Sequence, residues 1–186
     1  MILFINACVR KESRTNLLAN KLLAAKNRPI EEIRLTDLRF PVADEAFLDK
    51  RARLIAQGRF GDDLFSEARR FASADEIVIA APFWDLSFPA SLKQYFEQIN
   101  VVGITFRYMP AGVPEGLCKA GKLTFVTTAG GDYVPTEYGF GYVKALAQNF
   151  YGIPDVELIK ATGLDIDGRD AEAIVRAAWN AYETQS

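Results

Sequence analysis

The chain has 186 residues, of which 49% are hydrophobic and 25% are charged, and its formal net charge is −2 with a pI near 5.3. These values predict one globular domain over residues 1–186 and exclude nucleic-acid binding, which usually requires a basic stripe. The chain contains no histidine, so the commonest general base and transition-metal ligand are both missing.

The targeting and cysteine patterns are also informative. The apolar run at residues 2–7 is short and has no basic region before it, so we do not expect a signal peptide, and no run approaches a membrane span. Cys8 and Cys118 are far apart and in no CxxC pattern, which argues against a disulfide framework or a zinc site. We expect a cytoplasmic protein without metal or membrane partner, whose chemistry depends on a cofactor or on carboxylates.

Apolar runs and periodicities predict strands that alternate with helices. The expected strands are residues 2–7, 30–35, 76–81, 123–127 and 156–162. The expected helices are residues 17–25, 45–55, 62–72, 89–99, 138–151 and 169–182. This alternation predicts an α/β fold with right-handed crossovers and a parallel sheet. We expect the doubly wound strand order 2-1-3-4-5, with helices on both faces.

A polar loop, CVRKESRTN, follows the first strand. Ser13 is a good N-cap for the next helix, because its hydroxyl can accept from amides of the first turn. Free amides and the helix dipole favour an anion at such an end, and phosphate is the natural ligand. The alternative is an ordinary capped helix with two solvated arginines. The candidate phosphate donors are Arg10, Ser13, Arg14, Thr15 and Asn16.

The most informative stretch is residues 82–108, PFWDLSFPASLKQYFEQINVVGITFRY. Pro82 ends the third strand, and the loop that follows carries Phe83, Trp84, Asp85 and Leu86. Large apolar side chains on such a loop either hold a flat ligand or pack on their own domain, and spacing alone does not decide between the two. A third loop, Thr128–Gly131, contains a Gly-Gly pair that lets the backbone approach a ligand closely, although any tight turn uses one.

The three loops follow strands one, three and four, so in the expected strand order they converge on one site. The first loop offers phosphate donors, the second an apolar aromatic shelf, and the third close backbone amides. A ligand with a phosphate at one end and a flat ring at the other matches this division. Flavin mononucleotide (FMN) is such a ligand.

The 82–108 stretch closely resembles the FMN-dependent azoreductase and quinone reductase group of the flavodoxin-like NAD(P)H oxidoreductases. The resemblance continues through PEGL (114–117), TTAGG (127–131) and GYVKALAQNFYGIPDVELIKATGL (141–164). CVRKESRT is similar to the phosphate loop of the wider group, with Cys8 at the position of its first serine. Asp85 stands where the group usually has Asn.

The resemblance implies an enzyme that transfers hydride from NADH or NADPH through FMN to a quinone, azo compound or related aromatic acceptor in a ping-pong cycle. It also implies a homodimer, and no side chain is assigned a catalytic role. The implied FMN contacts are Arg10, Ser13, Arg14, Thr15 and Asn16 at the phosphate, Pro82, Phe83, Trp84, Asp85 and Leu86 along the ring, mostly through backbone atoms, and Thr128, Ala129, Gly130 and Gly131 at the pyrimidine end.

The alternatives are a one-electron carrier of the flavodoxin type and a flavin-binding protein without turnover. Carriers of that type are strongly acidic, whereas the charge of this chain is only −2. The sequence does not reveal the natural acceptor or the choice between NADH and NADPH.

Overall fold

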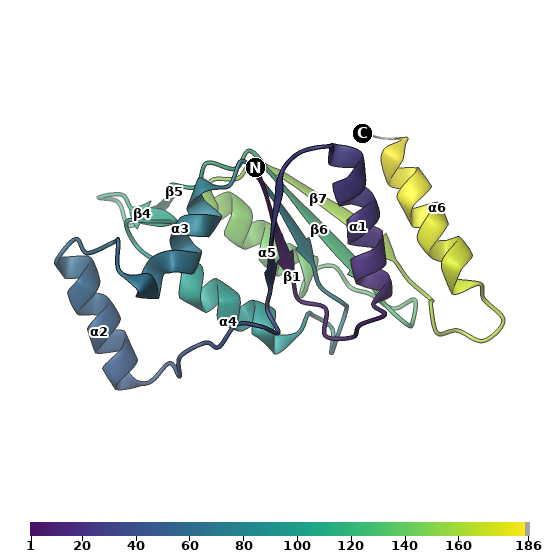
Figure 1. The fold of residues 1–186 in the computed structure, drawn as a ribbon, viewed down its shortest axis with the longest axis horizontal. Helices are drawn as coiled ribbons and strands as arrows, with labels where there is room; N and C mark the ends of the chain where they lie inside the picture. The colour runs from purple at the N-terminus through teal and green to yellow at the C-terminus, as the bar shows by residue number, and fades with distance from the viewer. Residues whose placement is uncertain (185–186) are drawn as a thin grey trace.

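A five-stranded parallel sheet forms the centre of the molecule in the computed structural model, which describes residues 1–184 (Figure 1). The strand order is β2-β1-β3-β6-β7, which confirms the predicted order 2-1-3-4-5 because β6 and β7 are the fourth and fifth strands of this sheet. The strands are β1 (Ile2–Asn6), β2 (Ile30–Arg34), β3 (Glu76–Ala80), β6 (Lys122–Thr128) and β7 (Asp155–Ala161).

Helices cover both faces of the sheet (Figure 1). One face carries α1 (Arg14–Lys26) and α6 (Ala171–Glu183). The other carries α3 (Ser66–Ser73), α4 (Ala90–Ile99) and α5 (Phe140–Leu146). The helix α2 (Glu45–Ala56) lies at the edge of this second layer.

The two hydrophobic cores follow from the alternation of side chains along the strands. Leu3 and Ile5 point into the core under α3, α4 and α5, whereas Ile2 and Phe4 point into the core under α1 and α6. Strand β1 is therefore buried on both faces, which is why it reads as a continuous apolar run.

Three local features differ from the sequence prediction. The expected helix at 62–72 is a 3₁₀ turn (Asp63–Phe65) followed by α3, and the end of α5 widens into a π-helix (Ala147–Tyr151). The turn-rich segment after Tyr108 contains an unexpected hairpin of β4 (Phe106–Tyr108) and β5 (Pro114–Gly116). These strands are short and lack apolar alternation, so periodicity gives no signal for them.

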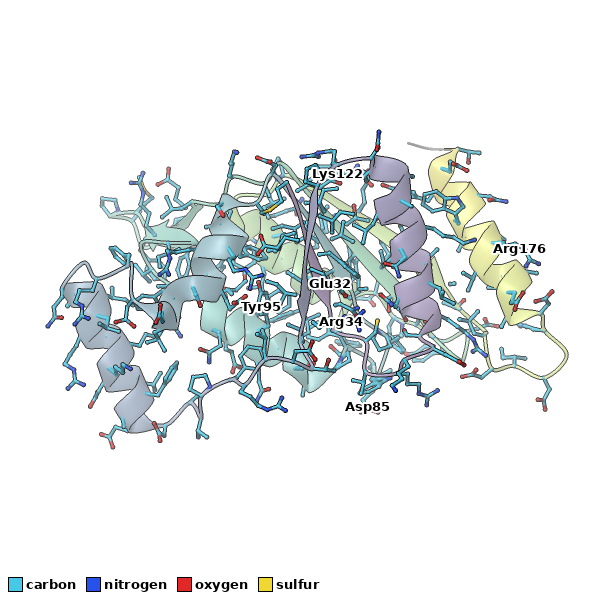
Figure 2. The ribbon with its side chains drawn as sticks, viewed as in Figure 1. Glu32, Arg34, Asp85, Tyr95, Lys122 and Arg176 are labelled. Atoms are coloured by element: carbon cyan, nitrogen blue, oxygen red, sulfur yellow. The ribbon has the colours of Figure 1, made fainter. Side chains whose placement is uncertain are left out.

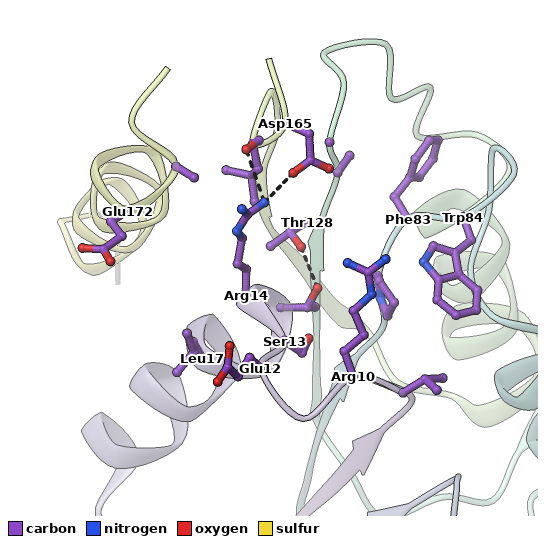
Figure 3. A pocket seen from close by; sticks show the side chains of 17 residues that line it. Arg10, Glu12, Ser13, Arg14, Leu17, Phe83, Trp84, Thr128, Asp165 and Glu172 are labelled. Atoms are coloured by element: carbon purple, nitrogen blue, oxygen red, sulfur yellow. Dashed lines mark hydrogen bonds and ion pairs between the residues drawn. The ribbon is translucent and has the colours of Figure 1, made fainter. Parts of the chain in front are cut away.

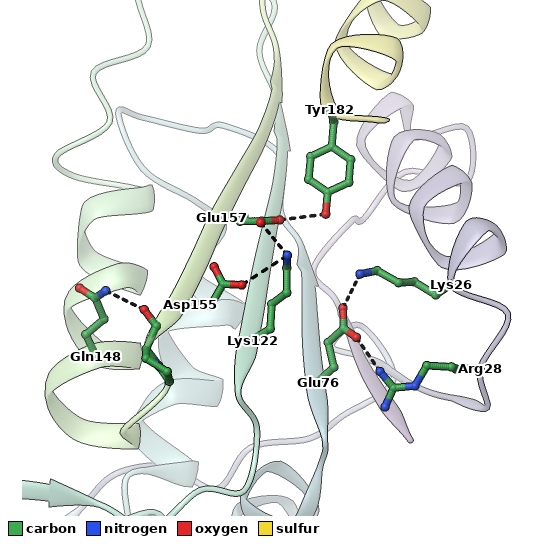
Figure 4. Close-up of polar contacts among 9 residues, drawn as sticks. Lys26, Arg28, Glu76, Lys122, Gln148, Asp155, Glu157 and Tyr182 are labelled. Atoms are coloured by element: carbon green, nitrogen blue, oxygen red, sulfur yellow. Dashed lines mark hydrogen bonds and ion pairs between the residues drawn. The ribbon is translucent and has the colours of Figure 1, made fainter. Parts of the chain in front are cut away.

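Ion pairs lie at the amino end of the sheet, where β3, β6 and β7 begin (Figure 4). The buried carboxylate of Glu76 lies 2.9 Å from Lys26 Nζ and 2.8 Å from an Arg28 nitrogen, and Lys122 Nζ lies 2.6 Å from Glu157. Pairing offsets part of the desolvation cost of such buried charges. None of the helices in residues 1–184 has the length and hydropathy needed to cross a membrane.

We predict that Gly116→Ala destabilises the protein by about 1–3 kcal/mol, the usual cost of overpacking. A Cβ at Gly116 would lie 2.1 Å from the backbone of Tyr151 and Gly152, so the hairpin would have to separate from the end of α5. Urea unfolding followed by circular dichroism measures the change. Gly121→Ala is the control, because a Cβ there meets nothing within 4 Å; equal stability of the two variants would contradict this packing.

Candidate functional site

The principal pocket lies at the carboxyl edge of the sheet and has a volume of about 600 Å³ (Figure 3). Its walls come from the loops after β1, β3, β6 and β7 and from the first turns of α1 and α6. Asp85, in the loop after β3, lies at the end of the molecule opposite Lys122 (Figure 2). The pocket therefore lies at the opposite end of the sheet from the ion pairs around Lys122.

The structure brings most of the sequence-predicted residues together in this pocket. Those that line it are Arg10, Ser13, Arg14, Thr15, Pro82, Phe83, Trp84, Thr128, Ala129 and Gly130. The predicted residues outside its lining are Asn16, Asp85, Leu86 and Gly131. The lining residues that sequence reasoning missed are Val9, Glu12, Leu17, Leu164, Asp165, Ala171 and Glu172.

The start of α1 forms the polar end of the pocket. Ser13 is the N-cap, as predicted, and its hydroxyl accepts from the amide of Asn16 at 3.2 Å. The amides of Arg14 and Thr15 belong to the first turn, where a helix supplies no carbonyl partner. A helix end with such donors favours a negatively charged ligand.

Asn16 connects this loop to the end of β1 through a side-chain hydrogen bond. Its side-chain oxygen accepts from the buried amide of Asn6 at 3.1 Å, and the Asn6 oxygen in turn accepts from the Cys8 backbone N–H at 3.0 Å. Burial raises the pKa of the Cys8 thiol, so this cysteine stays protonated at neutral pH. We infer that Asn6 and Asn16 shape the loop through the side-chain oxygen of Asn16, and the predicted contact of Asn16 with a phosphate stays a prediction.

A buried hydroxyl pair joins the first loop to the third. Thr15 Oγ1 and Thr128 Oγ1 are 2.6 Å apart, and both residues are buried. Thr128 ends β6, and its carbonyl accepts from the backbone N–H of Phe83 at 3.0 Å. The end of β6 therefore fixes the positions of both the helix start and the aromatic loop.

The aromatic loop contains a tight turn that explains the placement of Asp85 and Leu86. Trp84 and Ser87 exchange two backbone hydrogen bonds, of 3.2 and 2.7 Å, and the residues between them have φ values of +48° and +66°. Positive φ at both central positions is the geometry of a type I′ turn, which favours Asn, Asp and Gly. Asp85 suits this backbone, whereas Leu86 is strained in it. Both side chains are exposed at the tip of the turn, while Phe83 and Trp84 face the pocket (Figure 3).

A fourth loop, residues 163–170, completes the pocket. Its Asp165 N–H donates to the Gly130 carbonyl at 3.0 Å, and its Gly163 N–H donates to the Gly131 carbonyl at 3.0 Å. Arg169 forms an ion pair with Asp132 at 2.8 Å, and its hydrogen bond to that carboxyl lowers the pKa of Asp132. Gly131 thus anchors the third loop to the fourth. This loop follows β7, the strand next to β6. Its place in that strand order is the signal that could have predicted that it lines the pocket.

Comparison with known proteins identifies the family. The chain matches the model of a family described as flavodoxin-like fold over residues 1–185. It is 35% identical over 184 residues to an FMN-dependent NADH:quinone oxidoreductase of Lachnoclostridium phytofermentans, covering 94% of this chain and 92% of that protein. A Clostridium perfringens protein of the same name is 35% identical over 180 residues, covering 92% and 90%. The chain belongs to the flavodoxin-like family of FMN-dependent NADH:quinone oxidoreductases.

Solved structures agree with the observed fold. An FMN-dependent NADH-azoreductase from Bacillus anthracis, determined in complex with FMN, matches with a TM-score of 0.81 and 25% identity, covering 99% of this chain and 96% of that one. A second azoreductase structure from Bacillus anthracis matches with a TM-score of 0.83 and 24% identity, covering 99% and 97%. The family resemblance and the flavodoxin-like fold predicted from the sequence are both confirmed.

We predict that Thr15→Val and Thr128→Val each destabilise the protein by about 1–3 kcal/mol, because each leaves the buried hydroxyl of the other threonine without its hydrogen-bond partner. The double variant should cost less than the sum of the two, giving a coupling of about 0.5–1.5 kcal/mol in a double-mutant cycle. Thr124→Val is the matched control, because within the described structure its buried hydroxyl has no hydrogen-bond partner. Its stability should equal or exceed the wild type in urea unfolding. Strict additivity of the Thr15 and Thr128 changes would contradict the pairing.

Proposed function

We propose that this chain is an FMN-dependent oxidoreductase that takes electrons from NADH and passes them to a quinone or an azo compound. The observation that carries the proposal is that a single pocket joins an anion-binding helix start to an apolar aromatic wall. The relatives in the same family are named FMN-dependent NADH:quinone oxidoreductases, and the chain spans about nine-tenths of their length.

The residues present fit FMN. Ser13, the first-turn amides of α1 and Arg10 supply neutral and cationic donors for a phosphate. Phe83 and Trp84 line the other end of the pocket, where a flat ring gains apolar contact (Figure 3). Gly130 lines the pocket without a side chain, so a ring edge can approach its amide closely, whereas the Ala129 N–H already donates to the Ala161 carbonyl at 2.9 Å.

When bound, FMN supplies the electron-transfer chemistry, and the protein has to bind it, orient it and set its surroundings. The absence of histidine is compatible with this division of roles. The hydrogen bond from the Phe83 N–H to the Thr128 carbonyl holds the start of the aromatic loop against the end of β6. Trp84 keeps 43% of its surface exposed, which leaves apolar surface for a second flat substrate.

We also propose that the chain forms a homodimer in which exposed side chains around the aromatic loop are covered. These side chains are those of Leu86, Tyr133 and Tyr138, and Tyr133 is 79% exposed. Ser87 Oγ donates to the Tyr138 carbonyl at 3.2 Å, so two of the segments that carry them are in contact. The cytoplasmic location stays a prediction from the sequence.

The enzyme assay is the direct test of this function. We predict that the purified protein binds FMN and that NADH, added without oxygen, removes the visible absorbance of the oxidised flavin in one two-electron phase. Added quinone should then restore the absorbance. Formation of a stable one-electron form without NADH oxidation would instead indicate an electron carrier, and unreactive bound flavin would indicate a binding protein without turnover.

The dimer is tested separately. We predict a mass about twice 20.7 kDa by sedimentation equilibrium, and dissociation when Tyr138→Asp places a charge among the exposed apolar side chains. Tyr108→Asp is the matched control, because this tyrosine is also exposed but lies on the β4–β5 hairpin. A wild-type mass near 20.7 kDa would refute the proposal.

A further inference from the structure

One arginine at the polar end of the pocket is already bonded to a carboxylate. Arg14 Nη1 donates to Asp165 Oδ1 at 2.7 Å and to the Leu164 carbonyl at 3.2 Å. These bonds direct the guanidinium along the pocket toward the fourth loop (Figure 3). A phosphate at the start of α1 that takes Arg14 as a ligand must therefore share it with Asp165 or displace Asp165.

The fourth loop holds the Asp165 carboxylate in this position. The backbone N–H of Asp165 is bonded to the Gly130 carbonyl, and its side chain lies over the Gly130 Cα. A Cβ at Gly130 would lie 2.4 Å from Asp165 Oδ2, so the carboxylate occupies space that only glycine leaves open. The backbone of the third loop at Gly130 thus supports the Asp165 side chain that contacts Arg14.

The charges that line the pocket do not favour a dianion. Two guanidinium groups, those of Arg10 and Arg14, face three carboxylates, those of Glu12, Asp165 and Glu172. In residues 1–184, Asp165 is the carboxylate that pairs with Arg14, whereas Arg10 forms no ion pair. A phosphate in this pocket therefore gains less from arginine than the number of arginines suggests.

We propose that Asp165 competes with the flavin phosphate for Arg14 and so weakens the binding of phosphorylated ligands relative to unphosphorylated ones. This rests on the proposed function, because it takes FMN as the ligand. The side chains of Arg14 and Asp165 are 46% and 71% exposed, so their ion pair is solvated and exchanges easily. Asp165 is a specificity-determining residue that acts through Arg14, and it makes FMN easier to release.

The test compares FMN with riboflavin, which has the same ring and ribityl chain but no phosphate. Full-length protein freed of flavin is titrated with each compound, and quenching of flavin fluorescence gives the dissociation constants. Asp165→Asn should lower the dissociation constant for FMN by about two- to fivefold, the range expected for an exposed ion pair, and leave that for riboflavin unchanged. In an Arg14→Ala background, Asp165→Asn should leave FMN binding unchanged.

Glu172→Gln is the matched control, because it removes one negative charge from the same pocket wall without touching Arg14. Its effect on FMN should be smaller than that of Asp165→Asn. Weaker FMN binding by Asp165→Asn, an equal change for riboflavin, or an equal effect of Glu172→Gln would each overturn the proposal. Failure of the proposed function has a different signature: wild-type protein would bind neither flavin, or would bind FMN that NADH does not reduce.

Discussion

Parallel pairing of β1, β3, β6 and β7 is the constraint on which the rest of the structure depends. In this register the four strands end within two residues of one another, so the loops that follow them meet at one edge of the sheet. The apolar run of β1 is buried on both faces, and a shift by one residue would exchange the two cores that Leu3 and Phe4 occupy. Hydrophobic burial thus sets the register, and the register assembles a site from residues distant in sequence.

Hydrogen bonds then give this edge a defined shape. Thr15 and Thr128 join the start of α1 to the end of β6, and the third and fourth loops continue the β6–β7 pairing beyond the strands. Arg14 and Asp165 add a solvated ion pair across the same region. The buried hydroxyl pair is a structural link, whereas the exposed ion pair can exchange partners, and this difference separates the rigid part of the site from the adjustable part.

The sequence predicted the sheet, its order and the Ser13 cap, because these depend on apolar runs and on a capping pattern that acts locally. It did not predict the fourth loop, since GLDIDG carries no pattern that distinguishes a pocket wall from a connection. Asp85 and Leu86 were predicted to contact the ring mostly through backbone atoms, and a type I′ turn that the sequence did not predict directs their side chains to its tip. Asn16 was predicted as a phosphate contact, and the sequence did not predict that its side-chain oxygen also accepts from a buried partner, Asn6. These details depend on tertiary contacts, which local sequence does not encode.

A crystal structure of the protein with FMN is the most direct test of the central claim that the four loops form one flavin site. We predict that the phosphate lies within hydrogen-bond distance of Ser13 and the first-turn amides of α1, and that the ring lies against Phe83 and Trp84. A flavin bound with its phosphate away from α1, or with its ring outside the aromatic loop, would contradict the account.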